Sequence, residues 1–297
     1  MKKLLILSGK GGTGKTTVSA ALIRLSGARA IADCDVDAPN LHLIAQQSGA
    51  PETHDFMGGE KASVDPKKCI GCGCCVRSCR FNAIRISDGK ARVNEYTCEG
   101  CGVCVHVCPA EAASLLPDLA GQRALYRGET VFSTATLKMG RGNSGKLVTD
   151  VKMSMLRAAP ECALAVLDGS PGIGCPVIAS VSGMDLVLVV AEPSGSGVSD
   201  LERLCKTAAT LQAKLAVCVN KADVSPEHTV AIERFCAAQG LPFVGRIPYD
   251  PEAVKAVNEG RTVVDSDCPA GRAIRHIYTE LQRLLHDDAD ACNSNQC

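Results

Sequence analysis

Six short runs of apolar residues are distributed along the chain, and longer segments with helical periodicity lie between them. The runs are apolar nearly throughout, a pattern typical of strands that helices cover on both faces. They occupy residues 2–8, 28–33, 164–168, 186–192, 215–220 and 241–248. The helical segments include residues 15–26, 146–158, 198–211 and 228–239. This alternation predicts an α/β fold with a doubly wound, mainly parallel sheet, because parallel strands need crossovers between them.

The alternation is interrupted between residues 59 and 118, where apolar residues become sparse and cysteines concentrate. The cysteines form two series of four, and each cysteine of the first series has a counterpart 29 residues later. The series are Cys69, Cys72, Cys75 and Cys79, then Cys98, Cys101, Cys104 and Cys108. Repetition at a fixed offset indicates two copies of one small unit. We therefore expect residues 59–118 to form a module inserted into a larger domain made of residues 1–58 and 119–297.

Composition indicates which partners and which cellular compartment to expect. The 297 residues carry 32 Lys and Arg against 32 Asp and Glu, and this balance gives no reason to expect a nucleic acid or a membrane as a partner. The first apolar run is too short for a secretion signal. Eighteen cysteines then indicate a reducing cytoplasm, where thiols bind metal or stay free. The last helical segment has Ile274, Ile277, Leu281 and Leu284 on one face, which predicts packing rather than the alternative of membrane-surface binding.

A glycine-rich loop follows the first predicted strand and opens the first predicted helix. Its sequence, GKGGTGKT, fits the phosphate-binding pattern G-x-x-x-x-G-K-[ST] in the context that this pattern requires. Such a loop surrounds phosphates with backbone N–H groups, while Lys15 bridges the β and γ phosphates and Thr16 coordinates Mg²⁺. The residues expected at the nucleotide are Gly9, Gly11, Gly12, Thr13, Gly14, Lys15, Thr16 and Thr17.

Acidic residues follow another predicted strand. Asp33, Asp35 and Asp37 lie within five residues at its end. Three carboxylates close to a triphosphate make a plausible site for a metal ion and an attacking water. An acidic loop that binds no metal is the alternative.

Lys10 precedes the glycine pair, where a phosphate-binding loop needs no lysine. KGGTGKT with this lysine resembles the deviant phosphate loop of the MinD/ParA/nitrogenase-iron-protein class of P-loop ATPases, and DCDVDAPN and LDGSPGIGCP resemble its two switch segments. The resemblance implies that Lys10 reaches the phosphates of the other subunit in an ATP-dependent homodimer. It also implies that Asp35 orients the attacking water, that Asp35 and Asp168 join Thr16 at Mg²⁺, and that Gly172 donates to the γ phosphate. A solvated surface lysine is the alternative for Lys10.

The sequence VNKAD, residues 219–223, suggests a base-binding segment. N-K-x-D reads guanine in GTPases, but in the resembled family an asparagine at this place contacts adenine and an I-P-x-D segment follows. IPYD at residues 247–250 matches that segment. The resemblance therefore favours ATP over GTP, with Asn220, Pro248 and Asp250 at the base.

The cysteine series C-x2-C-x2-C-x3-C has the spacing of bacterial ferredoxins, in which the fourth cysteine ligates the other cluster. This spacing predicts a ferredoxin-like α+β module with two [4Fe-4S] clusters. One cluster takes Cys69, Cys72, Cys75 and Cys108, and the other takes Cys98, Cys101, Cys104 and Cys79. Zinc knuckles are the alternative, although they use four ligands in two pairs. Two departures from the ferredoxin pattern are Arg80, where proline is usual, and Cys74, a ninth thiol.

From end to end the chain resembles iron-sulfur ATPases of the MinD family, including GNSGKLV at residues 142–148, a candidate coupling element. We therefore expect ATP-dependent dimerisation to gate electron transfer, or metal or cluster delivery, to a client protein. One alternative is a positioning or assembly switch with structural clusters. Another is an electron carrier with a vestigial nucleotide site.

Overall fold

The computed structural model describes residues 1–43, 47 and 49–293, with side chains up to residue 286. The chain divides into two compact units. The larger unit comprises Met1–Thr53, Arg123–Thr136 and Ser144–Cys297, and the smaller, here called the cysteine unit, comprises His54–Gln122 and Leu137–Asn143. Cys292 and Cys297, the last two of the eighteen cysteines, lie outside the described side chains.

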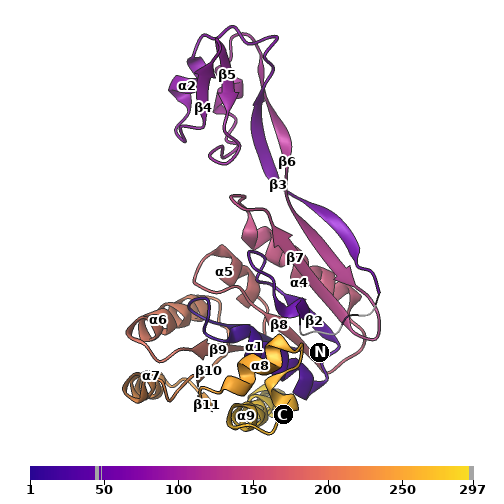
Figure 1. The fold of residues 1–297 in the computed structure, drawn as a ribbon, viewed down its shortest axis with the longest axis vertical. Coiled ribbons are helices and arrows are strands. Elements are labelled where there is room, and N and C mark those ends of the chain that lie inside the picture. Colours follow the sequence, from indigo (N-terminus) through magenta and orange to yellow (C-terminus); the bar gives the residue numbers. More distant parts are fainter. Residues whose placement is uncertain (44–46, 48, 294–297) are drawn as a thin grey trace. The chain divides into compact units, whose positions relative to one another are not determined.

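The larger unit is built on a parallel sheet with the strand order β11-β10-β9-β1-β8-β2-β7 (Figure 1). The strands are β1 Lys2–Leu7, β2 Ala30–Asp33, β7 Val131–Leu137, β8 Leu164–Asp168, β9 Leu186–Ala191, β10 Leu215–Asn220 and β11 Phe243–Ile247. All six strands predicted from apolar runs are present, and the mainly parallel α/β fold is confirmed. The strand order reverses beside β1, so the loops after β1 and β8 meet at the carboxyl edge of the sheet, where α/β folds bind ligands.

Helices cover both faces of this sheet. They are α1 Lys15–Ser26, α4 Ser144–Ala158, α5 Cys175–Val181, α6 Gly195–Thr210, α7 Pro226–Ala238, α8 Pro251–Asn258 and α9 Pro269–Asn293, with 3₁₀ turns at Leu41–Leu43 and Val263–Asp265. Helices α1, α8 and α9 share one face, and α4, α5, α6 and α7 pack in sequence on the other. None of the helices within the described residues is long and apolar enough to cross a membrane.

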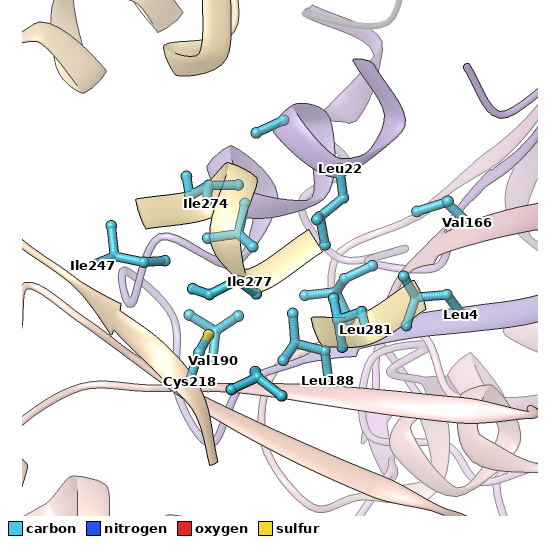
Figure 2. Packing of buried hydrophobic residues seen from close by; sticks show 14 of the residues in the cluster. Leu4, Leu22, Val166, Leu188, Val190, Cys218, Ile247, Ile274, Ile277 and Leu281 are labelled. Carbon is cyan, nitrogen blue, oxygen red and sulfur yellow. The ribbon is translucent and has the colours of Figure 1, made fainter. Parts of the chain in front are cut away.

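The predicted apolar face of the last helix packs against the sheet. In Figure 2, Ile274, Ile277 and Leu281 of α9 lie over Leu188 and Cys218, which belong to the central strands. All these side chains are at most 1% exposed. Full burial of such a side chain stabilises the fold by about 1.5–3 kcal/mol, so α9 is an integral part of the core. The remaining residue of the predicted face, at position 284, is partly buried at the margin of the same cluster.

The cysteine unit contains two long strands and a small ribbon. Its elements are β3 Glu52–Val64, β6 Ala113–Tyr126, β4 Ile84–Ser87, β5 Lys90–Val93, α2 Cys74–Ser78 and α3 Val103–His106. Strands β3 and β6 are hydrogen-bonded neighbours, and β4 pairs antiparallel with β5 (Figure 1). Most of β3 is exposed or half-buried, which explains why its sequence shows no apolar periodicity.

Candidate nucleotide site and cysteine cavities

The glycine-rich loop connects β1 to α1 at the carboxyl edge of the sheet. Gly12 and Gly14 have φ values of 80° and 90°, which only glycine adopts without strain. A Cβ on Gly14 would also stand 2.2 Å from Nδ2 of Asn220, and one on Gly9 would stand 2.2 Å from Cβ of Asp200. The glycines thus let the loop close tightly over the start of α1, whose first N–H groups favour an anion.

Asp168 organises the floor of this site. One of its carboxylate oxygens lies 2.9 Å from the Lys15 ammonium and accepts a hydrogen bond of 2.7 Å from the Thr16 hydroxyl. The other accepts a hydrogen bond of 2.6 Å from the Ser19 hydroxyl. Lys15 and Asp168 are buried, so the structure brings together three residues that the sequence places at the nucleotide and Mg²⁺. Ser19 is a contact that the sequence analysis missed, one turn beyond the loop motif.

Two further carboxylates adjoin Lys15. Asp35 lies 3.7 Å from the ammonium, and Asp33 is fully buried, where its two oxygens accept hydrogen bonds from the N–H groups of Asp35 and Leu41. Burial, together with the charge of Asp168, raises the pKa of Asp33 to about 7. Burial also raises the pKa of Asp35. The third carboxylate of the predicted group, at position 37, is exposed.

The side chain of Lys15 stays protonated although it is buried. Burial lowers its pKa, but the Coulombic attraction of Asp168, the hydrogen bond to it and the charge of Asp35 outweigh burial, and the net pKa is raised. A buried ammonium surrounded by carboxylates is therefore present beside the first turn of α1. This arrangement can neutralise phosphate oxygens when Asp168 exchanges its partner.

Lys10 turns away from its own loop. Its ammonium lies 2.7 Å from the carboxylate of Glu192 and donates longer hydrogen bonds to the hydroxyls of Ser194 and Ser196, at 3.4 and 3.3 Å. The side chain is 37% exposed. Hydrogen bonding from Lys10 lowers the pKa of Glu192, which keeps the pair charged near neutral pH. Lys10 therefore contacts neither Lys15 nor the acidic floor of the site.

A cavity of about 220 Å³ adjoins the loop on the side of β10 and β11. It is lined by all five predicted residues of this region: Gly14, Thr17, Asn220, Pro248 and Asp250. Its other lining includes Ile247, Tyr249 and Val254, which the sequence analysis did not single out. This largely apolar lining suits a planar base.

Two residues of this cavity already have partners. Nδ2 of Asn220 donates to the carbonyl of Thr13 at 2.7 Å and so supports the loop. The carboxylate of Asp250 accepts from the N–H groups of Glu252 and Ala270, at 3.0 and 3.1 Å, and thereby caps α8. The side chain of Asp250 therefore shapes the cavity wall. Its backbone carbonyl is also occupied, because it accepts from the N–H of Ala253 at 3.1 Å.

The N–H of Gly172, which the sequence predicts to donate to the γ phosphate, has another partner in this structure. Its φ is 95°, and its N–H donates to the carbonyl of Ser8 at 3.0 Å. The N–H would have to leave that carbonyl before it could contact a phosphate.

The residues present fit a nucleotide with Mg²⁺. The Thr13 hydroxyl is one of three buried side-chain polar atoms that have no hydrogen-bond partner in the described part of the chain. A buried hydroxyl without a partner is costly, and in a phosphate-binding loop a phosphate oxygen can accept its hydrogen bond. The oxygens of Thr16, Asp35 and Asp168 are the hard ligands that Mg²⁺ prefers.

The repeated cysteines line two separate cavities in the cysteine unit. The first cavity is lined by Cys69, Cys72, Cys74, Cys75 and Cys108. The second is lined by Cys79, Cys98, Cys101 and Cys104. Each cavity thus combines three cysteines of one series with the fourth cysteine of the other, which is the crossed grouping that the sequence predicts.

The sequence repeat is also a repeat in structure. The N–H of Ala91 points to Sγ of Cys69 and the N–H of Ala62 to Sγ of Cys98, both at 3.4 Å. These pairs are related by the same 29-residue offset. Lys90 and Lys61 likewise donate to the carbonyls of those two cysteines. Each copy therefore has an equivalent set of donors around its first cysteine.

Backbone donors favour thiolates in this unit. Hydrogen bonds from the N–H groups of Ala91 and Gly71 lower the pKa of Cys69. For Cys108 burial raises the pKa, but four backbone N–H groups together outweigh it and the net pKa is lowered. Thiolates that accept N–H bonds are suited to iron-sulfur clusters. Both of these cysteines line the first cavity, whereas burial raises the pKa of Cys75 in the same cavity and of Cys104 in the second. The lowered pKa values therefore favour a cluster in the first cavity.

Within the described residues, no group of three or more His, Cys, Asp or Glu side chains is arranged to hold a single metal ion. A cubane differs from a single ion, because each cysteine binds a different iron and the four sulfurs stand farther apart. The cavities are therefore the relevant observation for clusters. Cys74 lines the first of them as a ninth thiol, and its Sγ accepts from Arg77 at 3.4 Å.

Comparisons with known proteins agree with the nucleotide site. The family described as CobQ/CobB/MinD/ParA nucleotide binding domain matches residues 4–263. A protein of Methanocaldococcus jannaschii, itself uncharacterised, is 30% identical over 290 residues, which cover 95% of this chain and 97% of the relative. The iron-sulfur cluster carrier protein of Pyrococcus abyssi is 24% identical over 304 residues, which cover 96% of this chain and 87% of the relative.

Solved structures share the fold. The septum site-determining protein MinD of Pyrococcus horikoshii, complexed with Mg-ADP, superposes with a TM-score of 0.58 at 16% identity, and the match covers 95% of this chain and 96% of that one. At this identity the likeness shows the fold alone. The family match spans most of the sequence, and the relative from Methanocaldococcus jannaschii matches nearly end to end. The chain therefore belongs to the CobQ/CobB/MinD/ParA family of nucleotide-binding proteins and carries a MinD/ParA-like P-loop ATPase domain.

Proposed function

We propose that this protein is an ATP-hydrolysing iron-sulfur protein in which ATP-dependent dimerisation gates electron transfer, or metal or cluster delivery, to a client protein. Residues 54–122 form the main part of a ferredoxin-like insert with two [4Fe-4S] clusters. The observation that carries the proposal is the crossed grouping of eight cysteines in two cavities. Structural thiols have no reason to combine in this way, whereas two cubanes that exchange their fourth ligands require it.

The proposed binding and hydrolysis of ATP are supported by the groups around Asp168. When Mg²⁺ and ATP are bound, the metal neutralises phosphate charge. Lys15 then turns from Asp168 towards the β and γ phosphates, Thr16 and Asp168 face the metal, and Asp35 orients the attacking water. Burial raises the pKa values of Asp33 and Asp35, so negative charge on these carboxylates is unfavourable in this site. A bound cation relieves that repulsion, which favours binding.

Lys10 supplies the reason for a dimer. In the free chain its ammonium is held by Glu192 and is remote from the acidic floor of its own site. A second chain that closes over the nucleotide offers Lys10 a triphosphate as a new partner, with more negative charge than one carboxylate. Hydrolysis then depends on closure, because the additional positive charge reaches the transferring phosphoryl group only from the other subunit.

The relatives support the iron-sulfur assignment. The protein of Pyrococcus abyssi is named an iron-sulfur cluster carrier protein, and the match covers 96% of the present chain. That name is consistent with delivery of a cluster.

The test combines cluster content with the response to nucleotide. Protein purified anaerobically should contain about eight irons and about eight acid-labile sulfides per chain, as two cubanes require. ATP and a non-hydrolysable analogue should produce a dimer in size-exclusion chromatography and shift the cluster reduction potential, whereas ADP should do neither. Iron-free protein, or protein that does not bind adenine nucleotides, would refute the proposal. Full clusters and an ATP-dependent dimer without any shift in potential or transfer would instead support the positioning switch.

A further inference from the structure

The two repeats of the cysteine unit differ strongly in charge. Residues 66–93 contain seven Lys and Arg and one Asp, a net charge of +6. The equivalent window 29 residues later, residues 95–122, contains four Asp and Glu and no Lys or Arg, a net charge of −4. Lys90 belongs to the contacts that both copies build around a cysteine, since Lys61 is its counterpart. The other six positive charges of the first copy have no Lys or Arg counterpart in the second, so the fold of the repeat does not need them.

The difference holds position by position. Lys68 corresponds to Thr97, Arg77 to His106, and Arg85 to Ser114. The first member of each pair is exposed in the structure. Charges that the fold does not require, placed on a surface, serve solubility or recognition. A concentration in one repeat, in a chain of zero net charge, favours recognition.

The positive charge surrounds the first cysteine cavity. Arg77 donates to the carbonyl of Cys72 at 3.2 Å and to Sγ of Cys74, and Lys90 donates to the carbonyl of Cys69 at 2.5 Å. All three cysteines line that cavity. The ammonium and guanidinium groups are therefore fixed beside the residues that enclose the first cluster site.

The mouth of the same cavity is apolar. Ile70 lines it and is 68% exposed, and Ile86 lines it and is 42% exposed. The residue equivalent to Ile70 in the second repeat is Glu99, which lines the second cavity. The second cavity is also lined by two exposed apolar residues, Phe81 and Val103. The two cavities therefore differ mainly in charge: the repeat around the first is basic, whereas an acidic residue lines the second.

The β4–β5 ribbon adds a like-charge pair. Arg85 and Arg92 are directly opposite each other in the antiparallel register, and both are exposed. Within the described residues neither takes part in an ion pair. Like charges in this arrangement destabilise a ribbon, so an anionic partner that binds both would relieve the repulsion.

We infer that the basic and apolar surface of residues 66–93 binds an acidic protein over the first cysteine cavity. This inference rests on the proposed function in one respect, since that acidic protein is taken to be the client. An apolar centre formed by Ile70 and Ile86 within a charged rim is the composition of a protein–protein interface. A nucleic-acid interface would instead be more polar and would be dominated by phosphate contacts. The first cluster site is then the one through which the client exchanges electrons or cluster.

The experiment uses the anaerobically purified full chain and two probe proteins of opposite charge, an acidic flavodoxin and a basic cytochrome c, each labelled for fluorescence anisotropy. The unmodified chain should bind flavodoxin at least about tenfold more tightly than cytochrome c at low salt, and about 0.5 M salt should abolish the difference. A preference for cytochrome c, or equal binding of both probes, would overturn the inference. Because iron content is measured on the same sample, absence of clusters tests the proposed function separately.

A matched pair of variants locates the surface. Lys68→Gln with Arg85→Gln removes two positive charges from the first repeat, and Thr97→Glu with Ser114→Glu makes the same net change at the equivalent exposed positions of the second. The first variant should bind flavodoxin about tenfold more weakly, with iron content unchanged, and the second should lose less than about twofold. Equal losses in both variants would overturn the inference. A single-stranded oligonucleotide or anionic vesicles that bind more tightly than flavodoxin, and displace it, would also overturn the inference.

Discussion

The ammonium of Lys10 lies 2.7 Å from the carboxylate of Glu192, in the same chain and on the strand edge beside the phosphate-binding loop. Glu192 also lies 3.3 Å from the ammonium of Lys221, which donates to the carbonyl of Gly12. One carboxylate therefore restrains two lysines next to the nucleotide site. If Lys10 acts on the phosphates of a second subunit, this ion pair must break before the dimer closes.

Glu192→Gln should therefore favour the dimer. A partly exposed pair contributes less than about 1 kcal/mol, and one pair breaks in each chain, so its loss should strengthen ATP-dependent dimerisation by at most about 30-fold. Analytical ultracentrifugation with ATP measures this change. Glu202→Gln is the matched control, because it removes a similar carboxylate that pairs with Lys206 on the surface of α6. Weaker dimerisation of the Glu192 variant would show that the pair supports closure, and Lys10→Ala should abolish closure in either background.

Asp168→Asn should impair both stability and hydrolysis. The substitution leaves the buried ammonium of Lys15 with one ion pair, to Asp35 at 3.7 Å. Breaking a buried pair in this way costs about 3 kcal/mol in the free energy of unfolding. The ATPase rate should fall by about 100-fold or more, because the residue also faces the metal. Urea denaturation and phosphate release measure the two effects, and Asp37→Asn, at an exposed position, should change stability by less than about 0.5 kcal/mol.

The stability of the ligand-free protein should fall as the pH rises from about 4 to about 7. The pKa of Asp33 is raised to about 7 in the folded state, so between its ordinary pKa and that value the folded chain binds more protons than the unfolded chain. The loss from this group is on the order of 4 kcal/mol. Asp33→Asn should flatten the profile, at a cost of about 1 kcal/mol near pH 4.5 for one lost acceptor. Urea denaturation across this pH range, without nucleotide or Mg²⁺, decides the matter, and parallel profiles would contradict the assignment.

Double substitutions test the crossed cysteine groups. Cys69→Ala with Cys108→Ala removes two ligands from one predicted cluster, so about four irons per chain should remain. Cys69→Ala with Cys79→Ala removes one ligand from each cluster and should lose most of the iron. Cys74→Ala, the ninth thiol, should keep about eight irons. Iron and sulfide analysis distinguishes these outcomes, and equal losses in the two double variants would contradict the crossing.

The parts of the fold and of the site that could be predicted are those that neighbouring residues in the sequence specify. The six buried strands and the phosphate loop are visible in the sequence because each is specified by neighbouring residues, such as the glycines that precede Lys15. Strand β3 was not predicted, since most of its residues face solvent and it gains its hydrogen bonds from β6. The Lys10–Glu192 pair joins residues 182 positions apart, so no local sequence pattern could predict it. The same is true of the support that Asn220 gives to Thr13.

That support leads to the last prediction. Nδ2 of Asn220 donates to the carbonyl of Thr13 at 2.7 Å and lies where a Cβ on Gly14 would stand. Asn220→Ala leaves this carbonyl unpaired and the loop less ordered, so affinity for ATP and for ADP should fall about tenfold while the preference for adenine over guanine remains. Isothermal titration with ATP, ADP and GTP measures this.

Asp250→Ala is the matched control on the opposite wall of the cavity. It removes a helix cap and should lower stability by about 1 kcal/mol with little change in nucleotide affinity, because its carboxylate is occupied by the backbone of α8 and α9. If the Asn220 variant instead loses its discrimination between ATP and GTP at unchanged affinity for one of them, Asn220 reads the base directly. The hydrogen bond to Thr13 would then be exchanged for one to the nucleotide on binding, and the loop would depend on its glycines alone for its shape.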